Sequence, residues 1–215
     1  MVKFQVIPVT PYQQNCSLLW CEKTMEGVVV DPGGDLDRIK QAVQQLGITL
    51  VKIINTHAHL DHVGGVAALA KELELPIEGP HQEDDFWIQS LPNQAQMMGF
   101  PPASTFVPNR WLEQGDDIRF GEEVLEVRHC PGHTPGHVIF FHRGTKLAIV
   151  GDVLFQGSIG RTDFPRGDFD TLVKSIREQL WTLGDDVSFI PGHGPMSTFG
   201  HERKTNPFVS DKNFG

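Results

Sequence analysis

Four ionisable residues fall within six positions directly after a short apolar segment, and this cluster limits what the chain can fold into. The segment Val51–Ile54 has the composition of a buried strand and leads into the sequence THAHLDH. Ionisable groups beside a buried strand are unfavourable unless they have a partner. Alternate residues of an extended segment point the same way, so His57 and His59 can share one metal ion. Asp61 and His62 lie where the chain enters the next helix, so they can face a second point nearby.

Three later motifs each add one metal-ligating residue after an apolar segment with the pattern of a strand. The motifs are Pro131-Gly132-His133, Gly151-Asp152 and Pro191-Gly192-His193. In α/β folds functional residues gather at the carboxyl ends of strands, so we expect these motifs to meet the first cluster. Imidazole and carboxylate suit Zn²⁺, Fe²⁺ or Mn²⁺, and hydrolytic sites with two such ions hold them about 3.5–4 Å apart. The sequence therefore predicts two divalent metal ions with these ligands: His57, His59, Asp61, His62, His133, Asp152 and His193.

Apolar periodicity alternates between strand and helix along the chain, which predicts an α/β fold built of layers. The turn Pro32-Gly33-Gly34 separates an early strand from a helix over Leu36–Leu46, which Asp35 is expected to cap. The chain contains no internal repeat, low-complexity segment or linker, so we expect one domain over residues 1–215. Further strands are expected at 51–54, 117–120, 123–128, 137–142, 146–150 and 187–190, and further helices near 66–73, over 81–98 and near 172–180.

The overall charge and the cysteine content exclude several classes of protein. The formal net charge is −9, which argues against binding to nucleic acid or an anionic membrane, because binding to phosphate rests on Lys and Arg. Three cysteines are too few for a disulfide framework, which favours a reducing compartment, and we predict a cytoplasmic protein. No apolar run reaches the length of a membrane span and no signal peptide is evident. The sequence leaves the oligomeric state open.

Taken in order, the motifs resemble those of the metallo-β-lactamase superfamily over nearly the whole chain. The resemblance rests on THAHLDH, on HCPGHTPGH at residues 129–137, on Gly151-Asp152 and on the PGHGP sequence at 191–195. It implies a four-layer αβ/βα sandwich with the metal ions at one edge. Carried over by position, the ligands of the first ion are His57, His59 and His133, those of the second are Asp61, His62 and His193, and the bridging ligand is Asp152.

Within the superfamily the chain resembles the glyoxalase II branch, in particular its short bacterial members. The marks are FQGSIGRTDF at residues 155–164, Gly167-Asp168 and Asn206-Pro207-Phe208. Longer members carry a C-terminal helical domain that binds glutathione, whereas only residues 194–215 follow His193 in this chain. The resemblance implies a binuclear metal-dependent hydrolase that acts on an anionic thioester such as S-D-lactoylglutathione, with Zn²⁺ as the expected ion and Fe or Mn as alternatives.

The GRTDF sequence within the same run also resembles the persulfide dioxygenases, which is the main alternative. The resemblance implies a single iron for those enzymes, at the positions of His57, His133 and Asp152. A lactonase or another thioesterase on the same fold is a further alternative. The acidic charge disfavours a nuclease, and the presence of all seven ligands disfavours a metal-binding protein without catalysis.

Leaving-group chemistry favours a thioester among the possible substrates. Hydroxide held between two divalent cations can form near neutral pH and attack a carbonyl carbon. A thiol has a pKa of about 8.5, so a thiolate leaves without a strong acid. An amide or β-lactam nitrogen needs a proton donor, and the sequence offers no dedicated one. Asp61 is expected to accept a hydrogen bond from the hydroxide and thereby orient the lone pair of the hydroxide oxygen.

Two arginines, Arg161 and Arg166, are candidates for binding the anionic end of a substrate. The local spacing also suits an ion pair of Arg161 with Asp163 or Asp168, and we favour this interpretation. His137 is expected to support the ligands, because ligating histidines need partners that fix their orientation. The sequence does not separate core packing from an acyl-binding pocket for four apolar residues: Phe86, Trp87, Met97 and Phe100.

Overall fold

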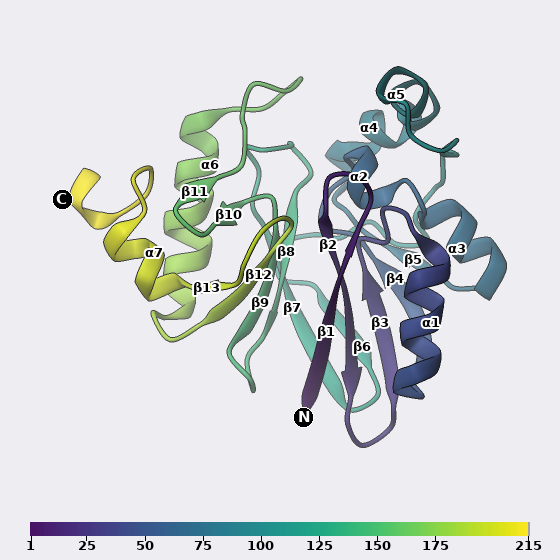
Figure 1. The fold of residues 1–215 in the computed structure, drawn as a ribbon. Helices are drawn as coiled ribbons and strands as arrows, with labels where there is room; N and C mark the ends of the chain where they lie inside the picture. The colour runs from purple at the N-terminus through teal and green to yellow at the C-terminus, as the bar shows by residue number, and fades with distance from the viewer. Residues whose placement is uncertain (215) are drawn as a thin grey trace.

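Two β-sheets pack face to face, and helices cover the outer face of each (Figure 1). The computed structural model describes residues 1–214. In the first sheet β1, β2 and β3 are antiparallel neighbours, whereas β3, β4 and β5 run parallel. The elements of this half are β1 (Val2–Val9), β2 (Gln14–Cys21), β3 (Glu26–Val30), α1 (Leu36–Leu46), β4 (Thr49–Ile54), α2 (Leu60–Val63), α3 (Val66–Leu73) and β5 (Ile77–Glu78).

The second sheet has the strand order β13-β12-β9-β8-β7-β6, and only β9 and β12 are parallel neighbours within it. Its strands are β6 (Asp117–Phe120), β7 (Glu123–His129), β8 (Val138–His142), β9 (Leu147–Gly151), β12 (Ser188–Pro191) and β13 (Ser197–Thr198), and β10 (Leu154–Phe155) pairs separately with β11 (Ser158–Ile159). The helices of this half are α6 (Phe169–Ser175), a π-turn (Ile176–Leu180), a 3-10 turn (Trp181–Leu183), α7 (Phe199–Thr205) and a 3-10 turn (Asp211–Asn213).

Side chains alternate across each sheet and build three apolar layers. In β3, Val28 and Val30 point between the two sheets, whereas Val29 packs in the layer that contains Ile39 of α1. In β8, Phe140 points between the sheets and Phe141 packs in the layer beneath α6. Because both faces of these central strands are covered, their sequences are continuous apolar runs rather than alternating ones. This arrangement confirms the predicted four-layer αβ/βα sandwich, with α1 and α3 on one outside and α6 on the other (Figure 1).

Two local expectations are wrong. The helix expected over 81–98 is divided into a 3-10 turn (Gln82–Asp84), α4 (Asp85–Gln89) and α5 (Leu91–Met98), because Pro92 in the first turn of α5 has no N–H to continue the helical hydrogen bonds. Asp35 does not cap α1, and its carboxylate instead accepts a hydrogen bond from the Thr10 backbone N–H at 2.7 Å. Helix α7 was not anticipated, and the Thr198 side chain caps it.

No helix within residues 1–214 combines the length and the hydropathy that a membrane span requires.

Candidate metal centre

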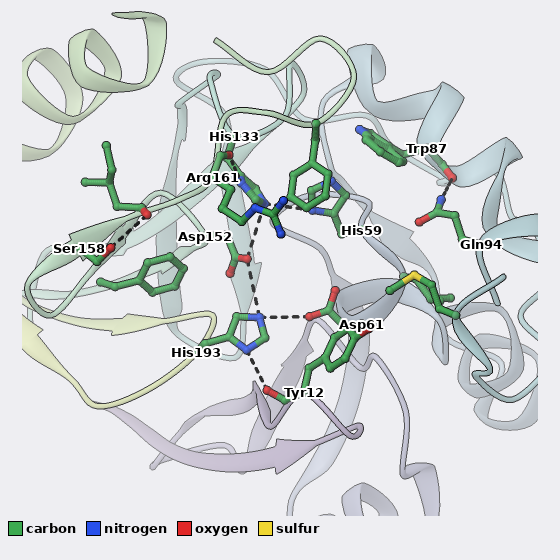
Figure 2. A pocket seen from close by; sticks show the side chains of 15 residues that line it. Tyr12, His59, Asp61, Trp87, Gln94, His133, Asp152, Ser158, Arg161 and His193 are labelled. Atoms are coloured by element: carbon green, nitrogen blue, oxygen red, sulfur yellow. Dashed lines mark hydrogen bonds and ion pairs between the residues drawn. The ribbon is translucent and has the colours of Figure 1, made fainter. Parts of the chain in front are cut away.

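All seven residues predicted as metal ligands lie together at one edge of the facing sheets. Figure 2 shows those that also line a pocket, namely His59, Asp61, His133, Asp152 and His193. The chain reaches this edge at the ends of β4, β7, β9 and β12, and the parallel pair β9 and β12 brings two of these strand ends side by side. The ligand positions are as follows: His57 and His59 after β4, Asp61 and His62 in α2, His133 after β7, Asp152 after β9 and His193 after β12.

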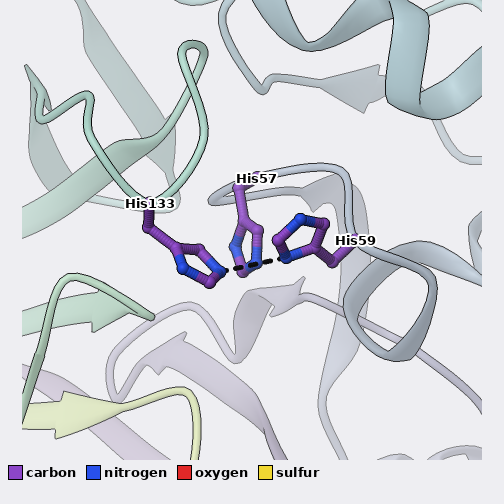
Figure 3. A group of neighbouring side chains, drawn as sticks. All are labelled: His57, His59 and His133. Carbon is purple, nitrogen blue, oxygen red and sulfur yellow. Dashed lines mark hydrogen bonds between the residues drawn. The ribbon is translucent and has the colours of Figure 1, made fainter. Parts of the chain in front are cut away.

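His57, His59 and His133 form the first group (Figure 3). One ring nitrogen of each lies within 4.8 Å of the others, and Nδ1 of His59 is 3.0 Å from Nε2 of His133. All three side chains are buried. Burial lowers the pKa of His59 to about 3 and holds the pKa of His57 well below its ordinary value. The rings are therefore neutral at physiological pH, which is the form that binds metals.

Asp61, His62 and His193 form the second group. Nε2 of His193 lies 3.1 Å from Oδ2 of Asp61, and Nε2 of His62 lies 3.7 Å from the same oxygen. Burial raises the pKa of the Asp61 carboxyl, but the neighbouring imidazoles of His62 and His193 outweigh burial and lower it overall. Asp61 is therefore ionised at neutral pH.

Asp152 lies between the two groups. Its carboxylate oxygens are 3.5 Å from Nε2 of His133, 3.3 Å from Nε2 of His62 and 3.7 Å from Nε2 of His193. The backbone of Gly192 passes so close that a Cβ at this position would collide with the Asp152 carboxylate. One carboxylate thus contacts histidines of both groups, which is the placement that the resemblance implied for a bridging ligand.

Hydrogen bonds fix the orientation of three of these imidazole rings. When Nδ1 donates its proton to an oxygen, the lone pair of Nε2 is left to face the centre. Three rings make such bonds: His133 to the Arg161 carbonyl (2.7 Å), His62 to the Asp31 carboxylate (2.9 Å) and His193 to the Tyr12 carbonyl (3.1 Å).

Several buried atoms that face the centre have no hydrogen-bond partner within residues 1–214. Buried polar atoms are rarely left unpaired in folded proteins, so these atoms require an explanation. Neutral imidazole nitrogens and carboxylate oxygens are the donors that divalent transition metals bind. The residues of both groups therefore fit two divalent ions, and the unpaired atoms are these: Nε2 of His57 and His62, and Oδ1 of Asp152.

Asp31 supports the site and was not predicted, because the sequence places it only in a turn after a strand. Its buried carboxylate accepts hydrogen bonds from the backbone N–H and the hydroxyl of Thr56, at 2.7 and 2.5 Å, and from Nδ1 of His62. Asp31 follows β3, the parallel neighbour of β4. The position of an acidic residue at the carboxyl end of a strand beside the THAHLDH strand is the signal that could have identified it.

His137 supports the site as predicted. It is fully buried, its ring stacks on His57 with centroids 4.5 Å apart, and its Nε2 accepts a hydrogen bond from the backbone N–H of Asp152 at 3.1 Å. This contact fixes the backbone from which the Asp152 carboxylate extends.

The loop that carries His193 is held in place by the hairpin of β1 and β2. The Asn15 backbone N–H donates to the Gly192 carbonyl at 2.7 Å, and the Asn15 amide donates to the carbonyls of Pro191 and Gly194 at 3.0 and 2.9 Å. Gln14 at the start of β2 also forms an isolated bridge with His193. A strand of the first sheet therefore positions a ligand of the second.

A pocket of about 550 Å³ opens beside the two groups (Figure 2). Trp87, Phe155 and Phe164 are among its lining residues, so a large part of its wall is apolar. Trp87 is half-buried and meets the ring of His59 edge-on at 4.6 Å. Of the other residues left open by the sequence, Met97 is 87% exposed, and Phe86 and Phe100 do not line this pocket.

The two arginines proposed for substrate binding occupy different places. Arg161 lines the pocket and forms a two-pronged ion pair with Asp163 at 2.8–2.9 Å, as favoured from the sequence. Arg166 is not among the lining residues. Its guanidinium lies 3.3 Å from the carbonyl oxygen of Glu83 and over the ring of Phe86.

A further group, His81, Glu83 and His129, also has potential ligand atoms within 4.8 Å of one another. Most of its ring nitrogens are already engaged. His81 Nε2 lies 3.1 Å from Glu113, His81 Nδ1 accepts from the Glu83 N–H at 3.2 Å, and His129 Nε2 donates to the Pro135 carbonyl at 2.8 Å. The contacts of this group thus explain it without a metal.

The metal-free protein is expected to lose stability as the pH falls from about 6.5 towards 4. Burial lowers the pKa values of His57, His59, His133 and His137, so in this window the unfolded chain binds protons that the folded chain does not. Each such histidine contributes up to about 1.4 kcal/mol per pH unit. Burial raises the pKa of Asp84 to about 6, and the carboxylates of Asp61 and Asp152 raise the pKa values of His62 and His193 despite burial. These groups act in the opposite direction, the two histidines only near pH 6.5, where the unfolded chain still titrates, and the four lowered histidines outnumber them. Urea denaturation of chelator-treated protein at pH 6.5 and 4.5 tests this, and equal stability at both would contradict it.

Comparison with known proteins agrees with the fold. Residues 9–193 match the family model of the metallo-beta-lactamase superfamily. The hydroxyacylglutathione hydrolase GloC of Haemophilus influenzae is 45% identical over 212 residues, covering 98% of this chain and 100% of GloC. The crystal structure of BLEG-1 B3 metallo-beta-lactamase has a TM-score of 0.88 at 33% identity, covering 96% of this chain and 99% of that one. TTHA1623 in a di-iron-bound form has a TM-score of 0.87 at 36% identity, covering 95% and 100%. The chain therefore belongs to the metallo-β-lactamase superfamily.

Proposed function

We propose that the protein is a binuclear metal-dependent hydrolase of thioesters such as S-D-lactoylglutathione. The observation that carries the proposal is that two complete ligand groups share the Asp152 carboxylate beside a pocket of a small-molecule ligand's size. The similarity to GloC, whose name gives it as a hydroxyacylglutathione hydrolase, supports the thioester part.

The residues have separate roles in this proposal. His57, His59 and His133 would hold one ion, and Asp61, His62 and His193 would hold the other. Asp152, whose carboxylate lies near histidines of both groups, would be a ligand shared by the two ions. When bound, the two ions lower the pKa of water and stabilise negative charge on a carbonyl oxygen. The ionised Asp61 carboxylate faces the pocket, where it accepts a hydrogen bond from the attacking water and so orients a lone pair of the water oxygen.

The charges in the pocket favour a thiolate leaving group. Asp61 and Asp152 are the two carboxylic acids that line the pocket, and the pKa of each is lowered by neighbouring histidines despite burial. Neither can donate a proton to an amide nitrogen at neutral pH. A thiolate leaves without such a donor. The apolar wall suits a substrate with an apolar part, and Arg161, whose guanidinium is paired with Asp163, is the arginine that lines the pocket.

Zn²⁺ is the proposed native ion, and iron is the main alternative because the similar protein TTHA1623 was solved with two irons. Both ions accept imidazole and carboxylate ligands. Metal analysis of the protein purified from its own host identifies the ion, and the proposal expects about two equivalents per chain.

A panel of substrates tests the reaction. Metal-replete protein is expected to release thiol from S-D-lactoylglutathione with kcat/KM at least about 100-fold above that for β-lactams, since rates differ by this factor for each ~2.7 kcal/mol of barrier. A simple lactone and an unrelated acyl thioester define the substrate class. Efficient β-lactam cleavage without thioester cleavage would refute the proposal. Oxygen uptake with glutathione persulfide, at one iron per chain, would instead identify a dioxygenase.

A further inference from the structure

The buried carboxylate of Asp84 lies between the segment that carries His57 and His59 and the loop that carries His133. It makes no hydrogen bond with these histidines within residues 1–214. Its side chain is 0% exposed and accepts three hydrogen bonds. Oδ2 accepts from the Ala58 backbone N–H at 3.0 Å and from the Thr134 hydroxyl at 2.8 Å, and Oδ1 accepts from the Gly136 backbone N–H at 2.6 Å. All the groups that face this carboxylate at hydrogen-bond distance are donors, so the site is built for an acceptor.

The three donors belong to loops of different sheets. Ala58 lies between His57 and His59, directly after β4 of the first sheet. Thr134 and Gly136 follow His133, after β7 of the second sheet. A single carboxylate therefore joins the two segments that carry all three histidines of the first group.

The packing around Asp84 leaves little freedom to this junction. A Cβ at Gly136 would lie 2.7 Å from Cγ and Oδ1 of Asp84, so the loop approaches as closely as a backbone can. The backbone N–H of His81 also donates to the Gly136 carbonyl at 3.1 Å, which gives the same loop a second fixed contact. Helix α4 begins directly after Asp84 and carries Trp87 against the ring of His59.

We propose that Asp84 is a positioning residue that sets the spacing of His57, His59 and His133, so that the affinity of this group for a metal ion depends on it. Asp61, His62 and His193 make no hydrogen bond with Asp84 within residues 1–214, so the second group keeps its affinity when Asp84 is changed. The inference rests on the proposed function in one respect, namely that the two groups hold metal ions.

The test is a zinc titration of metal-free protein in competition with a chromophoric chelator, which gives two dissociation constants. His59→Ala and His193→Ala assign each constant to its group. Asp84→Asn keeps the shape of the side chain but turns an amide N–H towards the Gly136 N–H. We expect the constant of the first group to rise about 10–100-fold, the range found when a partner of a metal ligand is removed, with the second constant close to wild type. Excess Zn²⁺ should restore most of the activity.

Asp85→Asn is the matched control, because within residues 1–214 the side chain of Asp85 makes one hydrogen bond, which it accepts from the Gln89 amide on the same helix. Both dissociation constants of this variant should equal those of the wild type. Thr134→Val removes one of the three hydrogen bonds at constant shape. If Asp84→Asn does not fold, the Thr134→Val variant provides the test. It should raise the dissociation constant of the first group by a smaller factor than Asp84→Asn.

Each result separates this inference from the proposed function. A wild-type protein that binds fewer than two zinc ions would refute the binuclear site itself. Two wild-type constants that Asp84→Asn leaves unchanged would overturn the positioning role while the proposed function stands. A lower thermal stability of the metal-free variant with both constants unchanged would reduce Asp84 to a purely structural residue and also overturn the inference.

Discussion

Asp152→Asn is expected to lower both the metal content and the turnover of the protein, with turnover falling at least about 100-fold. The carboxylate contacts histidines of both groups, so its loss removes a ligand from each. Loss of a residue that merely supports a ligand costs 10–100-fold, and loss of a shared ligand should cost no less. Metal analysis after dialysis and a thiol-release assay measure the two effects.

Asp170→Asn controls for the change of charge, because Asp170 is exposed on α6. It should keep both the metal content and the activity of the wild type. An Asp152→Asn protein with two bound metals and full activity would show that the ligand assignment is wrong.

Asp31→Ala is expected to reduce the free energy of unfolding by about 3–5 kcal/mol, the range seen when one partner of a buried polar or charged pair is removed. Its carboxylate accepts three hydrogen bonds, from two groups of Thr56 and from His62. Without Asp31 these buried donors lose their acceptor, and unpaired buried donors are unfavourable. The orientation of the His62 ring is also lost, so the second group should bind Zn²⁺ about 10–100-fold more weakly.

Asp37→Ala provides the comparison for stability. Asp37 is fully exposed, and its one ion pair within the described residues 1–214 is with Lys40 on α1, so its removal should change the free energy of unfolding by less than about 1 kcal/mol. Urea denaturation of both metal-free variants measures the difference. A change below about 1 kcal/mol for Asp31→Ala as well would contradict the assigned role.

The gathering of the seven candidate ligands at one place could be predicted from the sequence because its signals are local. The sequence THAHLDH follows a buried strand, and each later motif stands at the end of an apolar segment. The layered α/β architecture was predictable for the same reason, since continuous apolar runs such as that of β8 indicate strands covered on both faces. The structure brings these separate signals to one edge of the sheets.

The supporting residues could not be predicted with the same certainty because their roles exist only in three dimensions. Asp84 stands in a polar stretch with no motif of its own, and its partners lie 26 to 52 positions away in the sequence. The contribution of Arg161 to the site was also hidden in the sequence. Its backbone carbonyl accepts the hydrogen bond from His133, and a backbone contact does not depend on the residue type. The break before α5 was visible as Pro92, but the apolar residues on both sides of it suggested one continuous helix.

The contact between Asn15 and the loop around His193 has a consequence for how the protein is made. The hairpin of β1 and β2 leaves the ribosome before the loop that it holds, because that loop emerges only after β12 has been synthesised. A nascent chain therefore exposes the first histidines long before the last ligand can dock beside them. We expect the two groups of the candidate metal centre to come together only after synthesis has passed β12, so a metal ion that contacts both groups must meet a chain in which β12 has already been made.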